Sequence, residues 1–263
     1  MKIIMTMLLM FLGQAFAGDI TLDNLTQDDV TKISKEFSAN FIHTIVAPAS
    51  AYGKIFGFEL GVVGGITKSP NINRISKTFD SSADIPAIPH AGIALGVSVP
   101  LGFTGELSMI PSTKLGDVSL KNTSFGLKWT FTELTKLPFD MAVRLHAGSS
   151  TLSYADVVDT NVNAEVQWET SSKGANFEIS KNLLFFEPYF GFGTVSTETK
   201  IGVSASTNVN IFTFTSDQSY TSKNSGSQVY GGFNLNLFVL KIGVEAGSVM
   251  GVSKYSGKVS LYF

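Results

Sequence analysis

The sequence predicts an all-β transmembrane fold, a closed antiparallel up-and-down β-barrel of about ten strands that follows an N-terminal amphipathic helix. Apolar and polar residues alternate with period two through most of the chain after residue 54, as they do in strands with one apolar and one polar face. Only 15% of the residues are charged, yet beyond the first segment no run of about eighteen apolar residues could form a spanning helix. Backbone groups in lipid are satisfied only in helices or closed barrels. The chain is therefore either a barrel or a soluble exported protein, and the alternation favours the barrel.

Residues 1–17 have the anatomy of a cleavable secretory signal. Lys2 supplies an early positive charge before an apolar run, and Ala15 and Ala17 form a small-residue cleavage site before Gly18. The apolar run is too short to anchor the chain across a bilayer. We therefore expect residues 1–17 to be removed on export.

Charge and cysteine content exclude two classes of protein. The formal net charge is −2, whereas a nucleic-acid-binding protein normally carries a basic patch. The chain has no cysteine, so it is not a small secreted scaffold held together by disulfides.

Residues 18–53 differ from the rest and contain the expected amphipathic helix, within residues 25–46. Thr26 is a candidate N-cap, and Asp28 and Asp29 follow it in the first turn. Apolar residues recur at helical spacing at Val30, Ile33, Phe37, Phe41 and Ile45. A helix is about 10 to 12 Å across, which disfavours its insertion into a narrow barrel. We expect it to cap the periplasmic mouth, with simple packing at the membrane interface as the alternative.

Residues 54–263 are predicted to form the barrel, and eight or twelve strands remain open as alternatives to ten. The expected strands are Lys54–Lys68, His90–Val99, Phe103–Ile110, Val118–Phe131, Phe139–Tyr154, Val162–Ser180, Leu184–Thr199, Gln228–Leu237, Phe238–Val249 and Ser253–Phe263. Short and long connections alternate, as in barrels with short periplasmic turns and longer external loops. The polar stretch 201–227 is an external loop that contains alternating Phe and Thr, which favours a hairpin above the membrane or packing among loops.

The last strand carries a more specific pattern. Tyr255, Val259, Leu261 and Phe263 occupy alternate positions, with Gly257 an imperfect member of the series. This ending resembles the closing strand and assembly signal of Gram-negative outer-membrane β-barrel proteins. The resemblance implies an outer-membrane location, recognition by the barrel-assembly machinery, and contact with outer-membrane lipid and lipopolysaccharide.

Aromatic residues near the strand ends are expected to form two interfacial girdles. Those expected at the inner rim are Phe103, Trp129, Phe131 and Phe139, and those expected at the outer rim are Tyr154, Trp168 and Tyr255.

The polar parity of the strands predicts a charged lumen. Its expected polar members are Glu59, Glu106, Lys128, Asp140, Arg144, His146, Glu178, Glu187, Lys241 and Glu245. Both signs are present, which favours ion pairs that fill the lumen over a selectivity ring. Asp140 and Arg144 share a face with His146, but Ser150 lies too far along the strand for a catalytic contact. We expect no catalytic site, metal or cofactor.

Two classes of function follow from the sequence. One is a narrow channel or transporter for small or hydrophobic solutes, and the other is a structural or adhesive surface barrel with a closed lumen. An outer-membrane lipid-modifying enzyme is a distant third.

Overall fold

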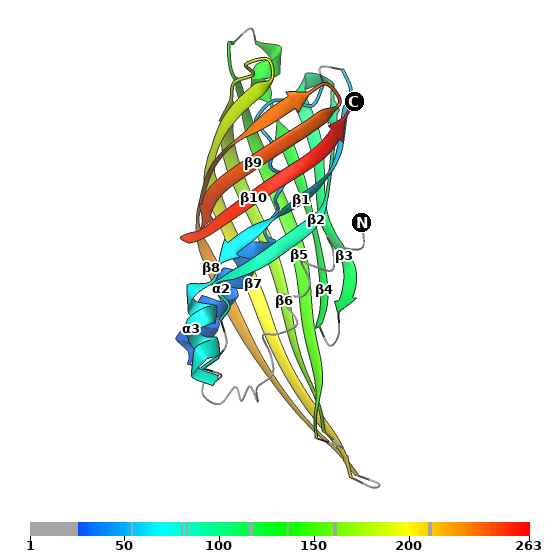
Figure 1. The fold of residues 1–263 in the computed structure, drawn as a ribbon, viewed down its shortest axis with the longest axis vertical. Coiled ribbons are helices and arrows are strands. Elements are labelled where there is room, and N and C mark those ends of the chain that lie inside the picture. Colours follow the sequence, from blue (N-terminus) through cyan, green and yellow to red (C-terminus); the bar gives the residue numbers. More distant parts are fainter. Residues whose placement is uncertain are drawn as a thin grey trace.

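The computed structural model describes residues 26–263, except 54, 80, 83, 116–117, 136, 160–161 and 210–211. The expected signal, residues 1–17, lies outside the described residues. The chain forms a closed antiparallel barrel in which each strand pairs with its neighbours in sequence and β1 pairs with β10 (Figure 1). The strands are β1 Gly57–Lys68, β2 Ala87–Val99, β3 Phe103–Leu115, β4 Val118–Trp129, β5 Asp140–Asp159, β6 Val162–Ser180, β7 Phe186–Val209, β8 Phe212–Leu237, β9 Leu240–Val249 and β10 Val252–Tyr262. Ten strands and their antiparallel order confirm the predicted fold.

The two ends of the barrel differ in their connections. At one end, here the short-turn end, the chain turns through η2 Pro100–Gly102, η3 Phe131–Leu134, residues 181–185 and residues 238–239. The C-terminus lies at the same end (Figure 1). At the other end, the long-loop end, β1 is connected to β2 through α3 Pro70–Phe79, a helix that the sequence pattern did not predict.

Four strands extend far beyond the others at the long-loop end. β5 to β8 run well past the rest of the barrel (Figure 1). β7 and β8 stay in register out to the pair Val209 and Phe212, so the polar stretch 201–227 belongs to a paired hairpin, one of the two arrangements that its sequence favoured. This hairpin can be rich in Ser, Thr and Asn, because neither face of an extension in water needs to be apolar.

The outer face of the barrel is apolar. Exposed large side chains cover it on every strand, among them Phe58, Leu60, Val62, Val97, Phe125, Leu127, Val143, Leu145, Ile179, Phe190, Phe192, Val229, Val244, Val259 and Leu261. The terminal-strand residues Tyr255, Val259, Leu261 and Phe263 are all exposed on this face, as the alternation predicted.

The expected aromatic girdles are only partly present. Phe103 and Trp129 are exposed beside the short-turn end, and their rings stack with centroids 5.7 Å apart. Phe131 and Phe139 are half-buried at that end. The outer-rim position expected for Trp168 is wrong, and the side chain of Tyr154 lies outside the described residues.

Trp168 faces the interior, where its ring stacks on Phe37 of the N-terminal helix at 5.8 Å. The pairing of β5 with β6 continues in register past residues 173–174 without a bulge. Trp168 therefore shares the inner face of β6 with Thr170, Asn176 and Glu178, which are buried. An aromatic ring is tolerated inside because a helix covers it.

The N-terminal helix exists but lies at the opposite mouth from the one expected. α2, Gln27–Phe41, begins with a capping box in which Thr26 and Asp29 bond reciprocally. It lies at the long-loop end beside α3, away from the C-terminus (Figure 1). The chain then passes from α2 to the start of β1 as an extended segment, residues 42–53, here called the lumen segment. An extended chain is narrower than a helix, so it fits where a helix would not.

Candidate functional site: a plugged lumen

The lumen is occupied by the protein's own N-terminal residues. Residues 42–49 are all buried, and the segment from Ile42 to Tyr52 contacts inward-facing side chains from β2, β3, β4, β9 and β10. We refer to α2 and the lumen segment together, residues 26–53, as the plug. Its contacts fall at three levels along the barrel.

At the long-loop end, Lys254 of β10 holds the end of α2. Its Nζ donates to the carbonyl oxygens of Ala39 and Asn40 at 3.2 and 2.9 Å and to the hydroxyl of Thr44 at 2.8 Å. These carbonyls belong to the last turn of the helix, which has no intrahelical donors for them and carries partial negative charge. Lys254 therefore acts as a C-terminal cap supplied by the barrel wall.

Glu36 connects α2 to α3. Its side chain is 1% exposed, and its carboxylate accepts hydrogen bonds from the backbone N–H groups of Asn71 and Ile72, both at 2.9 Å. The Asn71 amide also donates to it at 2.7 Å. Since Asn71 and Ile72 lie in the first turn of α3, a buried carboxylate of the plug caps the helix of the β1–β2 loop.

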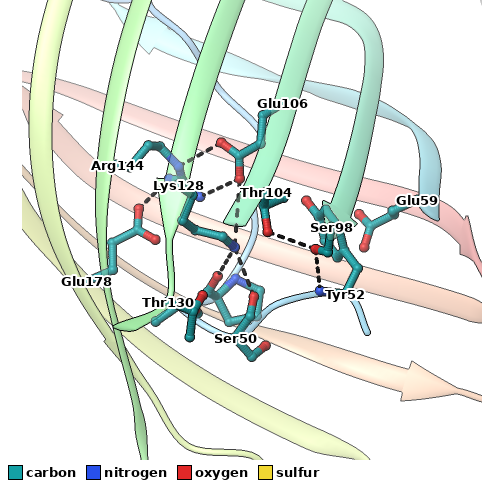
Figure 2. Close-up of polar contacts among 12 residues, drawn as sticks. Ser50, Tyr52, Glu59, Ser98, Thr104, Glu106, Lys128, Thr130, Arg144 and Glu178 are labelled. Atoms are coloured by element: carbon teal, nitrogen blue, oxygen red, sulfur yellow. Dashed lines mark hydrogen bonds and ion pairs between the residues drawn. The ribbon is translucent and has the colours of Figure 1, made fainter. Parts of the chain in front are cut away.

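Halfway along the lumen, Glu106 of β3 is the centre of an ion network. Its carboxylate lies 2.8 Å from Nε of Arg144, 3.7 Å from Nζ of Lys128 and 3.2 Å from Nε2 of His43 in the plug. Arg144 also pairs with Glu178, as Figure 2 shows. The expected ion pairs between lumen residues are thus present, and the plug adds a histidine to them.

At the short-turn end, the wall binds the backbone of the lumen segment. Lys128 donates to the carbonyl oxygens of Pro48 and Ser50 at 2.7 and 2.9 Å, and the Thr130 hydroxyl donates to that of Ala49 at 2.6 Å (Figure 2). The three consecutive carbonyls of Pro48, Ala49 and Ser50 are therefore satisfied by Lys128 of β4 and by Thr130, the residue that follows this strand.

Tyr52 completes this level. Its N–H donates to the Ser98 hydroxyl at 2.9 Å, and its ring lies 5.3 Å from Nζ of Lys128 and 5.1 Å from Nζ of Lys241. Cations at these distances from an aromatic face are attracted to it.

The remaining predicted lumen residues also point inward. Glu59 pairs with Lys258 and lies 3.3 Å from Lys241. Glu187 accepts from the Ser180 hydroxyl at 3.1 Å, and Glu245 accepts from the Tyr189 hydroxyl at 2.9 Å. Asp140, at the start of β5, is only half-buried.

Glycines of the wall make room for plug side chains. A Cβ at Gly96 would lie 2.1 Å from the Tyr52 ring, and one at Gly126 would lie 2.7 Å from Nε2 of His43. These glycines widen the lumen locally, and the plug fills the space that they leave. Beside Lys254, a cavity lined by Thr44, Gln228 and Glu245 has a volume of only about 10 Å³, about enough for one water molecule.

The lumen segment was not predicted from the sequence, because its apolar residues follow neither strand nor helix periodicity. Residues 42–53, IHTIVAPASAYG, contain no acidic residue, lysine or arginine and mostly small or apolar side chains. A run of this length without charge, directly after an amphipathic helix, is a signal for a buried extended segment.

Two negative findings apply to the described part of the chain. No helix in it is long and apolar enough to cross a membrane. No group of three or more His, Asp or Glu side chains there is arranged to hold a metal ion.

Comparison with solved structures finds β-barrels of low similarity. The attachment invasion locus protein Ail of Yersinia pestis, in complex with the heparin analogue sucrose octasulfate, is 11% identical with a TM-score of 0.31, over 78% of this chain and 99% of that one. The toluene transporter TodX of Pseudomonas putida is 8% identical with a TM-score of 0.24, over 88% and 96%. A mutant of the Rh. blastica porin is 5% identical with a TM-score of 0.22, over 80% and 100%. Scores this low carry no inference about function.

Comparison with curated protein sequences finds no match. A family model does match residues 25–255, which include the plug from Thr26 onward and nearly the whole barrel. The chain therefore belongs to DUF6588, a family of unknown function.

Proposed function

We propose that this protein is a narrow outer-membrane channel for small polar solutes, held closed in the described state by residues 26–53. The observation that carries the proposal is the plug itself: a separate segment, and not the side chains of the wall alone, closes a lumen whose wall is charged and polar. A wall of ion pairs and hydroxyls is hydrated readily if the segment leaves, whereas an apolar wall would not be.

The membrane location is supported by the outer surface. A closed barrel leaves no strand edge within lipid, and the exposed side chains of its outer face are apolar. Short turns in such barrels face the periplasm, so the proposed orientation places the C-terminus in the periplasm and α2 at the cell surface.

The polar wall narrows the class of solute. The interior of an eight-stranded barrel is filled by its own side chains, and a ten-stranded barrel is only slightly wider. The channel therefore excludes large molecules. Charges of both signs line it, including Glu59, Glu106, Lys128 and Arg144. Small hydrated solutes fit this lining better than hydrophobic ones, and strong selectivity for one sign of ion is not expected.

A closed surface barrel is the second candidate. It is favoured by the number of hydrogen bonds that fix the plug and by the polar hairpins of β5 to β8, which project beyond the mouth (Figure 1). In this alternative the plug is a permanent part of the core, and the hairpins carry any contact with other surfaces.

Deletion of residues 27–50 tests the channel. In planar bilayers the intact protein should give at most small, intermittent currents, and the deleted barrel should give steady ones. Heat-modifiable migration in detergent gels verifies that each variant is folded. A folded deletion variant without conductance would refute the channel and favour the closed surface barrel.

A further inference from the structure

All three histidines of the chain lie where the plug meets the wall. His43 belongs to the lumen segment, His90 to β2 and His146 to β5, and their exposed fractions are 5%, 8% and 5%. His90 bridges the plug and the wall, since its Nδ1 lies 3.0 Å from the Asn40 amide oxygen and its Nε2 lies 3.0 Å from the Ser256 hydroxyl. Histidine is the side chain whose charge changes near neutral pH, so this interface holds every imidazole of the protein.

His43 and His146 form a stacked pair. Their ring centroids are 5.7 Å apart, with an angle of 19° between the planes. The wall leaves room for both rings with glycine: a Cβ at Gly126 would lie 2.7 Å from Nε2 of His43, and one at Gly174 would lie 2.4 Å from Nε2 of His146. Any side chain larger than glycine at position 126 or 174 would therefore collide with one of the two rings.

The hydrogen bonds of the pair fit neutral rings. His43 has Nε2 at 3.2 Å from Glu106 and Nδ1 at 2.9 Å from the Ser124 hydroxyl, which also lies 3.2 Å from the Ser108 carbonyl oxygen. A ring with one proton on Nε2 is satisfied when the Ser124 hydroxyl donates to Nδ1 in place of the Ser108 carbonyl. Neither nitrogen of His146 has a hydrogen-bond partner among the described residues, and the Gln228 amide oxygen also has none. A second proton on His146 would create a buried cation beside His43 and Arg144, and these unfavourable neighbours are offset only in part by Glu106 and the Gln228 side chain.

The carboxylates near the two histidines already form ion pairs with other side chains. Glu106 faces Arg144 and Lys128 as well as His43, and Glu178 faces Arg144. The titratable and charged groups around the pair are Glu106 of β3, Lys128 of β4, Arg144 of β5, Glu178 of β6, Tyr230 of β8, Glu245 of β9 and Lys254 of β10. Charging both rings therefore adds two positive charges to a site that already contains Arg144, Lys128 and Lys254.

We infer that acid releases the plug. Protonated His43 and His146 repel each other in the plugged state, and both charged rings are better hydrated after the lumen segment has left the lumen. Imidazoles in water are half-protonated near about pH 6.5. Below that pH, each proton taken up on release favours the released state by about tenfold per pH unit. Release as a means of opening the pore rests on the proposed channel, but displacement of the plug can be measured without it.

A single cysteine reports displacement directly, since the natural sequence has none. Ala47→Cys, at a fully buried position of the lumen segment, is labelled with a polar maleimide in the full-length chain. Ser225→Cys, at an exposed position of β8, corrects for the pH dependence of the thiol itself. Ala49→Cys is the second buried position if Ala47→Cys does not fold.

We expect the labelling rate of Ala47→Cys, relative to Ser225→Cys, to rise at least tenfold between pH 7.5 and pH 5.5. In the His43→Gln, His146→Gln background the ratio should stay constant. If the double variant does not fold, His146→Gln alone should show a shallower rise. A ratio that is constant in the histidine-containing chain, or that rises equally without the two histidines, would overturn acid release.

The proposed channel and the proposed acid release of the plug can be refuted independently. Labelling that rises with acid while the plug-deleted barrel carries no current would leave the release standing and remove the channel. Steady current through the deleted barrel with pH-independent labelling would leave the channel standing and remove the release.

Discussion

At the scale of single residues, buried charged side chains of the lumen bind the plug as well as one another. Lys128 is fully buried, yet only one of its contacts is a carboxylate, Glu106 at 3.7 Å, while two are carbonyl oxygens of the lumen segment at 2.7 and 2.9 Å. Burying an ammonium group is favourable only when its donors are satisfied. The plug is thus part of what makes a charged wall stable in this barrel.

Lys128→Met should therefore loosen the plug. The carbonyls of Pro48 and Ser50 would lose their donor, and each buried acceptor left without one costs about 1 to 3 kcal/mol. We expect the open probability in planar bilayers to rise about tenfold or more. Lys121→Met, on the exposed side of the same strand, is the matched control and should leave the currents unchanged. Equal currents from the two variants would show that Lys128 does not hold the plug.

At the scale of elements, α2 and α3 form a two-helix lid whose parts come from different regions of the sequence. Glu36 joins them in the buried interface, and Arg74 donates to Asp29 at 2.6 Å on the surface. The N-terminal cap of α2 was predictable from Thr26 and Asp29, because a capping box is local. The partner helix was not, since Pro70–Phe79 shows its apolar face only at Ile72 and Ile75, which are buried.

The pKa of Asp29 tests this lid. A hydrogen bond from Thr26 and then one from Arg74 lower the pKa of its carboxyl from 3.8 to about 2. Because the folded-state pKa is depressed, the stabilisation is present above about pH 4 and is lost as the pH falls through 2. NMR titration of the carboxyl carbon should give a midpoint near pH 2. Thr26→Ala should raise the midpoint more than Arg74→Ala, and an ordinary midpoint in the unsubstituted chain would contradict the cap.

At the scale of the whole molecule, closure depends on the seam between β1 and β10. The two strands pair from Glu59 with Tyr262 to Thr67 with Lys254. Phe263 extends the seam, since its N–H donates to the Phe58 carbonyl and its carbonyl accepts from the Phe58 N–H, both at 2.8 Å. Its ring is exposed on the outer face. The final residue therefore contributes backbone bonds to closure and presents an aromatic side chain outside.

Removal of Phe263 should reduce the yield of assembled barrel and increase its degradation. Phe263→Ala keeps the two backbone bonds and loses only the ring, so comparison of the two variants separates closure of the seam from recognition of the aromatic residue. The yields are read from heat-modifiable bands in outer-membrane fractions at high expression. Unchanged yields for both variants would refute an assembly role for this residue.

The sequence by itself determined the barrel and the inward set of charges. Residues such as Glu106 and Arg144 fall on the inner face because period-two alternation is a local property of each strand, and all the predicted strands are present with bounds shifted at several ends. The capped helix was likewise local. These features need only neighbouring residues for their definition.

Only the tertiary structure decided where the N-terminal segment lies. His43 contacts Glu106 across 63 positions of sequence, and Lys254 caps α2 across more than 200. No periodicity encodes such partners, because a lumen is created only when the first and last strands pair. The face of Trp168 follows from the unbroken alternation of β6, but the helix that covers its ring is distant in sequence and is placed there only by the tertiary structure.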